Sequence, residues 1–507
     1  KILSVAAGKD VELNTSGNLY NSAAADTDSA ISGKNIILNA GKTGASDPYG
    51  SIGTASKYMT ITLKGGNISA TATGNINIQS LGTDNPLIID IMSAGKTGES
   101  YNTESGNIFL KSASDIYLAE KTSTLQNYIS SKSNGQISLQ SDGSIGSAEH
   151  IVRIINSGKD QKTNNFATDE GVISLTAVKD IYAEGVSTAA KDSSNRQAAG
   201  GYFNLKTLNS TDGDVQLTIN GTLNLNQDVT VTKDFKLYVN ESADLYKNIT
   251  AKNIVMTATN NISMADGVKL KAETVTLTTD TIPTLSYGTI AKGTTGNGVI
   301  RQGNETNYTN ISGKMDTSTT TAFNSTSAIE TNELKATATK GIYLGGKNDS
   351  RNVVLHNKEN NVVYHNMANV TGSRNNDVLN ISVCNYNEAD KTSSPITGTV
   401  WIYNQGKDAA SAQLAKDMRI VGGVYAQQDV DIETLGNLYN AVPQTAVAIT
   451  GNNIYLDAGA NGAGVPDSSI GTASAHMTIT EGEGNLTAKA TGNIYNTGDI
   501  NVKGKGK

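Results

Sequence analysis

The residue types that most often carry chemistry are few and scattered in this sequence of 507 residues. Of the four histidines (His150, His356, His365 and His476), only His356 and His365 lie near each other. They are nine positions apart, which is not the spacing of a known metal site. The one cysteine, Cys384, follows a strand-like apolar run and is interpreted as a small buried hydrophobic residue. No Gly-x-Ser-x-Gly sequence marks a nucleophilic serine, so we expect no catalytic residue and no metal site.

Two Gly-Lys-Thr runs, at 41–43 and 95–97, invite comparison with the loop that cradles nucleotide phosphates. That loop needs an earlier glycine where this sequence has Ile36 and Asp90, so the comparison fails. No Gly-x-Gly-x-x-Gly opens a helix, and no calcium-binding Gly-Gly-x-Gly-x-Asp repeat occurs. We therefore expect no cofactor.

Carboxylates and aromatic rings remain as candidates for binding. Glycoside hydrolases need two carboxylates about 5–10 Å apart, whereas the acidic residues here are spread singly along the sequence. Tyrosine is abundant, with 20 residues against 5 phenylalanines. Because exposed Tyr and Trp rings stack well on sugar rings, the candidates for glycan or partner contact are Tyr364, Tyr386, Trp401 and Tyr403.

Charge and composition exclude several classes of protein. The net charge of −7 argues against a nucleic-acid partner and against attraction to an anionic membrane surface. A single cysteine forbids an internal disulfide. No apolar run approaches the roughly 18–20 residues that a membrane-spanning helix needs, so we expect no membrane insertion.

A long internal repeat dominates the organisation of the chain. The sequence Gly-Asn-Leu-Tyr-Asn at 17–21 returns at 436–440, and Ser-Ile-Gly-Thr-Ala-Ser at 51–56 returns at 469–474. The sequence therefore holds a little more than one copy of a unit of about 420 residues, which predicts a section of a tandem array.

A shorter and looser repeat predicts the fold. Its core is a Gly with Asn, Asp or Lys, followed by alternating apolar residues, as at 33–38, 74–78, 106–110 and 135–139. Alternation over four to six residues indicates short strands, and Gly and Asn tolerate positive φ at the corners. Such strands bury a face only by stacking, so we expect an all-β fold, a parallel β-helix (β-solenoid) of roughly 20–25 coils of 20–25 residues. The alternative is an array of β-sandwich domains, which usually contain more aromatic residues.

Four segments are expected along this β-solenoid. Residues 1–208 form the start of the repeat unit, and residues 209–345 form more divergent coils. Residues 346–424, rich in Asn and containing Cys384 and Trp401, form further coils or an excursion from them. Residues 425–507 begin the next repeat unit.

Three blocks of sequence carry a resemblance to a known family. Gly50–Ala55 (GSIGTA) is followed by Met59–Thr62 (MTIT), Gly143–Ala148 (GSIGSA) by Ile151–Ile154 (IVRI), and the third block is 469–480. They resemble a motif of filamentous haemagglutinin-like adhesins, large secreted proteins of bacteria with a Gram-negative envelope. The match covers roughly 1–185 and 425–507. It implies a right-handed parallel β-helix shaft displayed at the cell surface.

The motif itself has a structural interpretation. The isoleucines are expected to point inward and the glycines to permit a sharp corner, at the pairs Ile52 and Gly53, Ile145 and Gly146, and Ile470 and Gly471. In the following strand Met59 and Ile61 are expected to fill the core, while Thr60 and Thr62 point outward.

The leading hypothesis is a non-enzymatic shaft of a secreted or cell-surface adhesin that mediates cell adhesion or aggregation. Its expected partners are copies of itself or adjoining repeats, and glycans or proteins on host or bacterial surfaces. Two alternatives stay open: a self-assembling extracellular filament or matrix subunit, and a carbohydrate-active β-helix enzyme.

Overall fold

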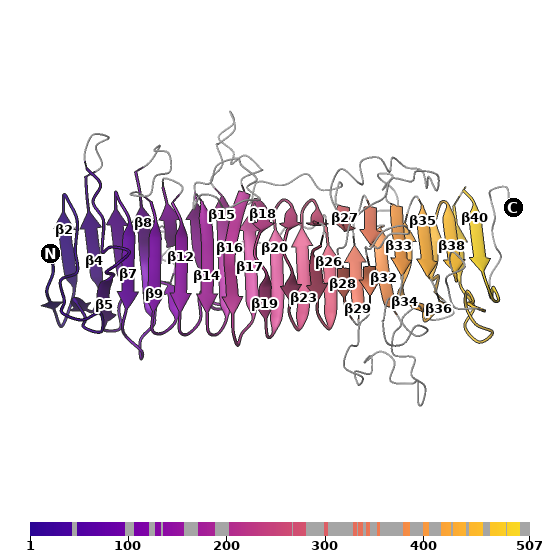
Figure 1. Cartoon of the computed structure of the whole chain (residues 1–507), viewed down its shortest axis with the longest axis horizontal. Coiled ribbons are helices and arrows are strands. Elements are labelled where there is room, and N and C mark those ends of the chain that lie inside the picture. The colour runs from indigo at the N-terminus through magenta and orange to yellow at the C-terminus, as the bar shows by residue number, and fades with distance from the viewer. Residues whose placement is uncertain are drawn as a thin grey trace. The chain divides into compact units, whose positions relative to one another are not determined.

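The computed structural model describes residues 1–42, 48–96, 106–120, 127–132, 135–156, 171–187, 202–265, 267–279, 299–302, 328–331, 333–337, 341–344, 352–354, 379–385, 399–404, 417–426, 429–434, 436–442, 446–459, 467–482 and 484–496. These residues form strands, bridges and turns, and none of them is helical. They belong to two compact units, the first within Lys1–Glu241 and the second within Ser242–Ile282 and Thr294–Lys507. In each unit the strands lie side by side as coils of a parallel β-solenoid (Figure 1).

The first unit contains two ladders of strands that alternate along the chain. One ladder consists of β1 (Val5–Ala6), β3 (Ile31–Gly33), β5 (Met59–Leu63), β7 (Ile76–Ser80), β9 (Ile108–Ser112), β12 (Ile137–Ser141), β14 (Val172–Ala177), β16 (Tyr202–Ser210), β18 (Thr222–Leu225) and β19 (Val229–Val231). The other consists of β2 (Val11–Thr15), β4 (Ile36–Ala40), β6 (Ile68–Ala72), β8 (Leu87–Ala94), β10 (Ile116–Leu118), β11 (Tyr128–Ser131), β13 (Val152–Asn156), β15 (Ile181–Ser187), β17 (Val215–Asn220) and β20 (Asp234–Val239).

The second unit repeats this arrangement. One ladder consists of β21 (Ala243–Leu245), β22 (Ile249–Thr250), β24 (Ile262–Met264), β25 (Lys269–Lys271), β27 (Val299–Gln302), β28 (Ala328–Glu330), β30 (Gly341–Leu344), β31 (Asn352–Val354), β33 (Thr399–Asn404), β35 (Val430–Thr434), β38 (Ile454–Ala458) and β40 (Leu486–Ala490). The other consists of β23 (Asn253–Ala258), β26 (Thr274–Thr278), β29 (Glu333–Thr337), β32 (Leu379–Asn385), β34 (Met418–Ala426), β36 (Leu438–Asn440), β37 (Ile449–Gly451) and β39 (Ile479–Glu481). The pairings are parallel, as between β4 and β6 or between β38 and β40.

Hydrogen-bonded residues on neighbouring coils give the length of each coil. In the first unit the separation is 25 residues between Asp10 and Asn35, 34 between Asp180 and Asp214, and 20 between Asp214 and Asp234. Coils of 21 and of 32 residues occur in the second unit. The expected length of 20–25 residues therefore holds for the shorter coils, and the longer ones reduce the number of turns below the 20–25 expected from that length.

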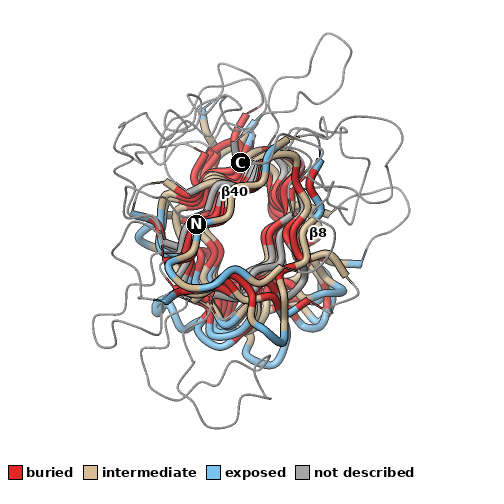
Figure 2. Tube along the Cα trace, turned by 90° about the vertical axis from the view of Figure 1, so that its right-hand side faces the viewer, coloured by how far each residue is buried: buried red, intermediate tan, exposed pale blue. Residues whose placement is uncertain are grey.

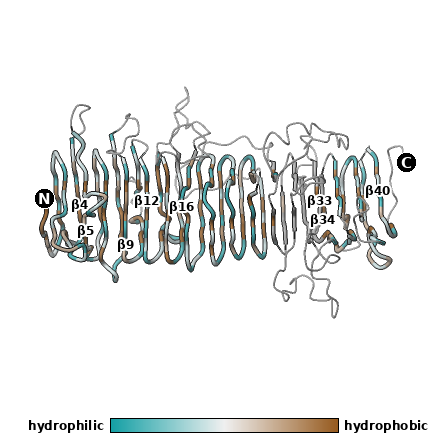
Figure 3. Tube along the Cα trace, in the orientation of Figure 1, coloured by the Kyte–Doolittle hydropathy of each residue, from teal (hydrophilic) through white to brown (hydrophobic). Residues whose placement is uncertain are grey.

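The core of each coil consists of aliphatic side chains stacked in register. Ile108, Ile137 and Ile173 oppose one another on β9, β12 and β14, and each is 0% exposed. Buried residues alternate with more exposed ones along such strands (Figure 2). Hydrophobic and hydrophilic residues likewise alternate along the coils (Figure 3). Burying one such side chain contributes about 1.5–3 kcal/mol, so the stacking offsets the entropy of ordering short, polar coils.

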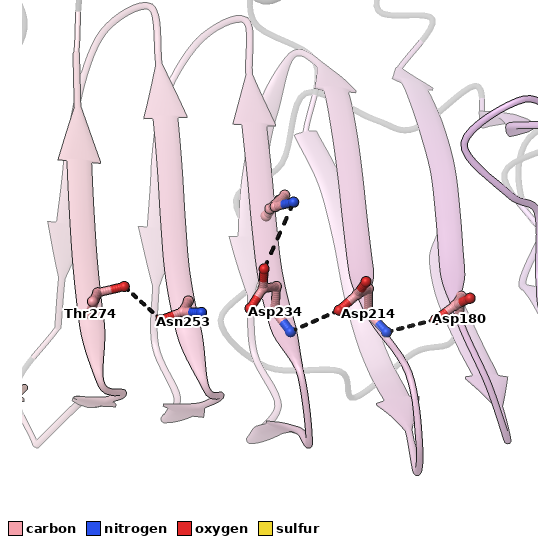
Figure 4. Close-up of polar contacts among 6 residues, drawn as sticks. Asp180, Asp214, Asp234, Asn253 and Thr274 are labelled. Atoms are coloured by element: carbon pink, nitrogen blue, oxygen red, sulfur yellow. Dashed lines mark hydrogen bonds and ion pairs between the residues drawn. The ribbon is translucent and has the colours of Figure 1, made fainter.

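The corners of the coils are joined by side chains that bind backbone. The Oδ1 atom of Asp180 accepts the N–H of Asp214 at 2.8 Å, and the Oδ1 atom of Asp214 accepts the N–H of Asp234 at 3.0 Å (Figure 4). Asn75 and Asn107 do the same for the coils that follow them. Each Asp or Asn thus supplies an acceptor for an N–H at the corner of the next coil, where an unpaired N–H would be costly.

This use of asparagine differs from the expectation that it supplies positive φ. Among the described residues, positive φ is confined to glycines and Asp467. Asparagine acts through its side chain instead, both at the corners and in amide ladders between coils. Asn224 Nδ2 donates to Asn204 Oδ1 at 3.1 Å, and Asn240 Nδ2 donates to Asn220 Oδ1 at 2.9 Å. These pairs form Asn ladders between neighbouring coils.

The long repeat preserves one polar cluster, which occurs once in each unit. In the first, Thr60 Oγ1 donates to Asp28 O at 2.6 Å and accepts from Ala30 N and Asn21 Nδ2. In the second, Thr478 makes the same three contacts, with the backbone at 446 and 448 and with Asn440. Met59 and Ile61 fill the core as expected, and Thr60, which was expected to point outward, is nevertheless only 1% exposed. The segment that follows Asn21 covers it and uses its hydroxyl to satisfy backbone groups.

The corner hydrogen bonds give a first prediction. Asp214→Ala removes the acceptor of the Asp234 N–H, and we expect it to lower the free energy of unfolding by about 1 kcal/mol. Asp214→Asn keeps an acceptor and should lose much less. Urea denaturation measures the stability, and hydrogen exchange should show faster exchange of the Asp234 amide in the alanine variant alone. Asp84→Ala, at an exposed turn, is the control. Equal loss in both Asp214 variants would contradict this role.

The repeat also offers a natural comparison at one buried carboxylate. Glu481 occupies the position that Leu63 holds in the first copy, and the two are 8% and 2% exposed. Neither Glu481 carboxylate oxygen has a hydrogen-bond partner among the described residues. Burial raises the pKa of Glu481 above its ordinary value of 4.5. An unsatisfied buried polar group typically costs about 1–3 kcal/mol.

We therefore expect Glu481→Leu to raise the free energy of unfolding by about 1–3 kcal/mol at neutral pH. Because the pKa is higher in the folded than in the unfolded state, ionisation favours unfolding as pH rises. The gain should be complete above the folded-state pKa, should shrink as the pH falls from that pKa towards 4.5, and should stay at its smaller value below pH 4.5. Urea denaturation across this pH range measures it. Leu63→Glu should destabilise with the opposite pH dependence, and a gain independent of pH would contradict the argument.

Candidate binding groove

The three corner motifs form the same local structure. Ile52 is fully buried and forms parallel bridges with Leu19 and Ile76 on the neighbouring coils. The next backbone N–H, from Gly53, donates to Leu19 O at 2.9 Å. The hydroxyl of Thr54 then accepts the N–H of Lys57 and closes the turn. Equivalent bridges and turns occur at Ile145, Gly146 and Ser147 and at Ile470, Gly471 and Thr472.

The glycine of each motif is required in two ways. Gly53, Gly146 and Gly471 have φ of 63°, 75° and 70°, a region that side chains with Cβ rarely adopt. A Cβ at Gly53 would also lie 2.4 Å from the carbonyl oxygen of Asn77. The motif glycines and the turn hydroxyls therefore build the corners.

The aromatic residues singled out in the sequence are only partly placed. Tyr364 and Tyr386 lie outside the described residues. Trp401 and Tyr403 lie on β33, where the backbone pairs Trp401 with Asp431 and Tyr403 with Glu433 of β35. Their use in glycan contact stays a prediction.

Two histidines that the sequence leaves isolated have aromatic neighbours. The ring of His476 stacks on Tyr495, with centroids 6.2 Å apart. The ring of His150 lies 5.6 Å from that of Tyr117, tilted by 35°. His150 is half-buried. His356 and His365 lie outside the described residues.

Tyr117 and His150 line an open groove of about 730 Å³ on the outer side of the first unit. The strands β6, β8 and β10 supply its floor. Its polar lining comprises Asn67, Ser69, Asp90, Glu120 and Asn127, and the remainder is Ile88, Ile91, Leu118 and Ala119. The groove thus combines an aromatic pair and two isoleucines with carboxylates and amides.

The carboxylate of Asp90 lies within this groove and accepts a hydrogen bond from Asn67 Nδ2 at 3.1 Å. Burial raises the pKa of Asp90, and the bond from Asn67 partly opposes this rise. Burial also raises the pKa of Tyr117 to about 12, with the charges of Asp115 and Asp180 adding to the effect. Tyr117 therefore keeps its hydroxyl proton at neutral pH and presents an uncharged ring.

Sequence reasoning did not find this groove, although one local signal marks it. The run Leu87–Ala94 (LIIDIMSA) breaks strict alternation, because Asp90 and Ile91 stand between the buried Ile89 and Met92. Such a break indicates an extra residue in a strand. The neighbours Tyr117 and His150 come from other coils, and only the stacking register brings them together.

Comparison with known proteins gives no further guidance, because no family model, curated protein or solved structure matches this chain. Within the described ranges, no three His, Cys, Asp or Glu residues are grouped so as to hold a metal ion. The described part of the chain also contains no helix that is long and apolar enough to cross a membrane.

The corner motif yields a prediction with an internal control. Gly53→Ala places a Cβ against backbone atoms of two other residues, so we expect a loss of about 2–4 kcal/mol in the free energy of unfolding. Gly65 also has positive φ, 78°, but a Cβ there meets nothing within 4 Å. Gly65→Ala should therefore cost only about 1–2 kcal/mol. Urea denaturation compares them, and an equal loss in both variants would show that the close approach at Gly53 is unimportant.

Proposed function

We propose that this chain is a section of the non-enzymatic shaft of a large filamentous adhesin that is secreted or displayed at a bacterial cell surface. The observation that supports this most is the parallel stacking of coils, bonded to their neighbours at strands and corners alike. A protein of this construction grows by adding coils, because each coil contacts only its neighbours. Its length is therefore set by the number of repeats.

Stacked coils also suit a mechanical role. The inter-coil hydrogen bonds run along the stack, and the side-chain bonds of Asp180, Asp214 and Asn75 add to those of the backbone. Aliphatic columns such as Ile108, Ile137 and Ile173 follow the same direction. Because the hydrogen bonds and the aliphatic columns both run along the stack, both oppose bending of the stack and separation of its coils, as in other stacked-strand assemblies. Such a stack suits holding binding surfaces away from a cell.

The partners proposed for the shaft are adjoining repeats or copies of the same chain, together with glycans or proteins on cell surfaces. The long repeat supports the first. The polar cluster of Asn21 and Thr60 returns as Asn440 and Thr478 with the same contacts, so this part of the unit folds in the same way in both copies. The resemblance of the corner motifs to filamentous haemagglutinin-like adhesins supports the extracellular location.

Electron microscopy of the purified chain tests the proposal. We expect thin rods about 20–30 Å wide, and an axial spacing near 4.8 Å in fibre diffraction, because parallel strands of adjacent coils have that separation. Compact beads would contradict a shaft. Filaments with a defined helical lattice that form without any receptor would favour the self-assembling matrix subunit instead.

Two further assays test the proposed location and the absence of catalysis. Antibody labelling of intact producing cells, before and after brief protease treatment, should show a signal that protease removes. A signal only after lysis would contradict surface display.

Incubation of the purified chain with bacterial and host glycans should release no reducing ends, and release would favour the carbohydrate-active enzyme.

A further inference from the structure

The groove on the first unit is built around an irregularity in the strand ladder. Between β6 and β8 the register shifts, so that Ile68 opposes Ile89 while Ser69 opposes Ile91. Asp90 is the extra residue of this β-bulge. Bulges redirect side chains and occur often beside binding sites. Here the bulge places Asp90 and Ile91 together at the groove, whereas Ile89 and Met92 remain in the core.

The aromatic side of the groove comes from the adjacent coil. β10 pairs with β8 in unbroken register, which sets Tyr117 beside Ile88 on the outer face. His150 lies against the Tyr117 ring. The two rings, tilted by 35° to each other, and the side chain of Ile88 form a platform on this side of the groove. Tyr117 and Ile88 are uncharged.

The polar side of the groove offers both acceptors and donors. Asp90 receives one hydrogen bond from Asn67, and a carboxylate has room for several more. Asn127 Nδ2 donates to Ala119 O at 2.7 Å, so this amide is held in place at the edge of the groove. Glu120 adds an exposed carboxylate. A platform with carboxylates and amides beside it matches a sugar ring, whose C–H face is apolar and whose hydroxyls are donors and acceptors.

We propose that this groove binds a neutral saccharide, with a pyranose ring stacked on Tyr117 and hydroxyl groups bonded to Asp90 and Asn67. The volume of about 730 Å³ is within the range of small-ligand sites. Asp90 and Glu120 repel sulfated and uronic acid sugars, so charge selects an uncharged chain. In this proposal the shaft carries a glycan site of its own. The biological role of that site rests on the proposed function as an adhesin shaft.

The test uses the full purified chain and a glycan array with neutral, N-acetylated, uronic and sulfated oligosaccharides. We expect binding to one or more neutral tetrasaccharides of hexose or N-acetylhexosamine and none to the sulfated or uronic sugars. Isothermal titration with the best neutral tetrasaccharide then compares variants. Tyr117→Ala and Asp90→Ala should each weaken binding at least about tenfold. Tyr117→Phe should stay within about threefold, because it keeps the stacking ring.

Tyr455→Ala is the matched control, since Tyr455 is also a half-buried tyrosine beside carboxylates but belongs to the second unit. It should leave the affinity unchanged. Circular dichroism and the behaviour of Tyr117→Phe separate loss of the ring from loss of folding. Absence of binding, binding only to anionic sugars or cationic peptides, or binding that Tyr117→Ala does not alter would overturn the inference. None of these outcomes affects rod formation, so electron microscopy tests the proposed shaft independently of the saccharide assay.

Discussion

The structure of each unit depends on one requirement: the backbone N–H groups of a coil must be met by acceptors on its neighbour. Along the strands the parallel ladder meets it. At the corners further backbone bonds, such as that from Gly53 N to Leu19 O, are joined by bonds to Asp or Asn Oδ1 atoms, as Asp180 provides for Asp214. Because both kinds of bond fix the same register, the aliphatic side chains of successive coils are brought into columns. The backbone register therefore aligns the core side chains, and the packing of those side chains in turn stabilises the register.

The same requirement explains what the long repeat preserves and what it changes. Asn21 and Thr60 bind backbone groups that would otherwise be unpaired, and Asn440 and Thr478 do so again. Other positions differ between the copies: Tyr58 of the first copy corresponds to His476 of the second. A repeat unit of this kind keeps its coil geometry while its outer surface varies. That combination suits a shaft whose copies present different surfaces.

The groove proposed to bind saccharide lies where the ladder departs from regularity. A strictly alternating strand presents every second side chain outward, and its neighbours on the next coils lie in flat rows. The extra residue Asp90 interrupts this pattern and places a carboxylate next to Ile91. The neighbouring coil then supplies Tyr117, and a corner turn supplies His150. Here a local change in register and the side chains of neighbouring coils together form the groove.

The sequence by itself determined the class of fold, because short alternating strands such as Ile108–Ser112, bounded by Gly-Asn corners, bury their apolar face by stacking on one another. It also determined the corners at Ile52 and Gly53, since their conformation depends on residues a few positions away. Tertiary structure alone decided coil length, the burial of Thr60, and the meeting of Asp90, Tyr117 and His150. Those features depend on which residues of different coils share a register. That register results from the sum of many inter-coil bonds, and no local pattern encodes it.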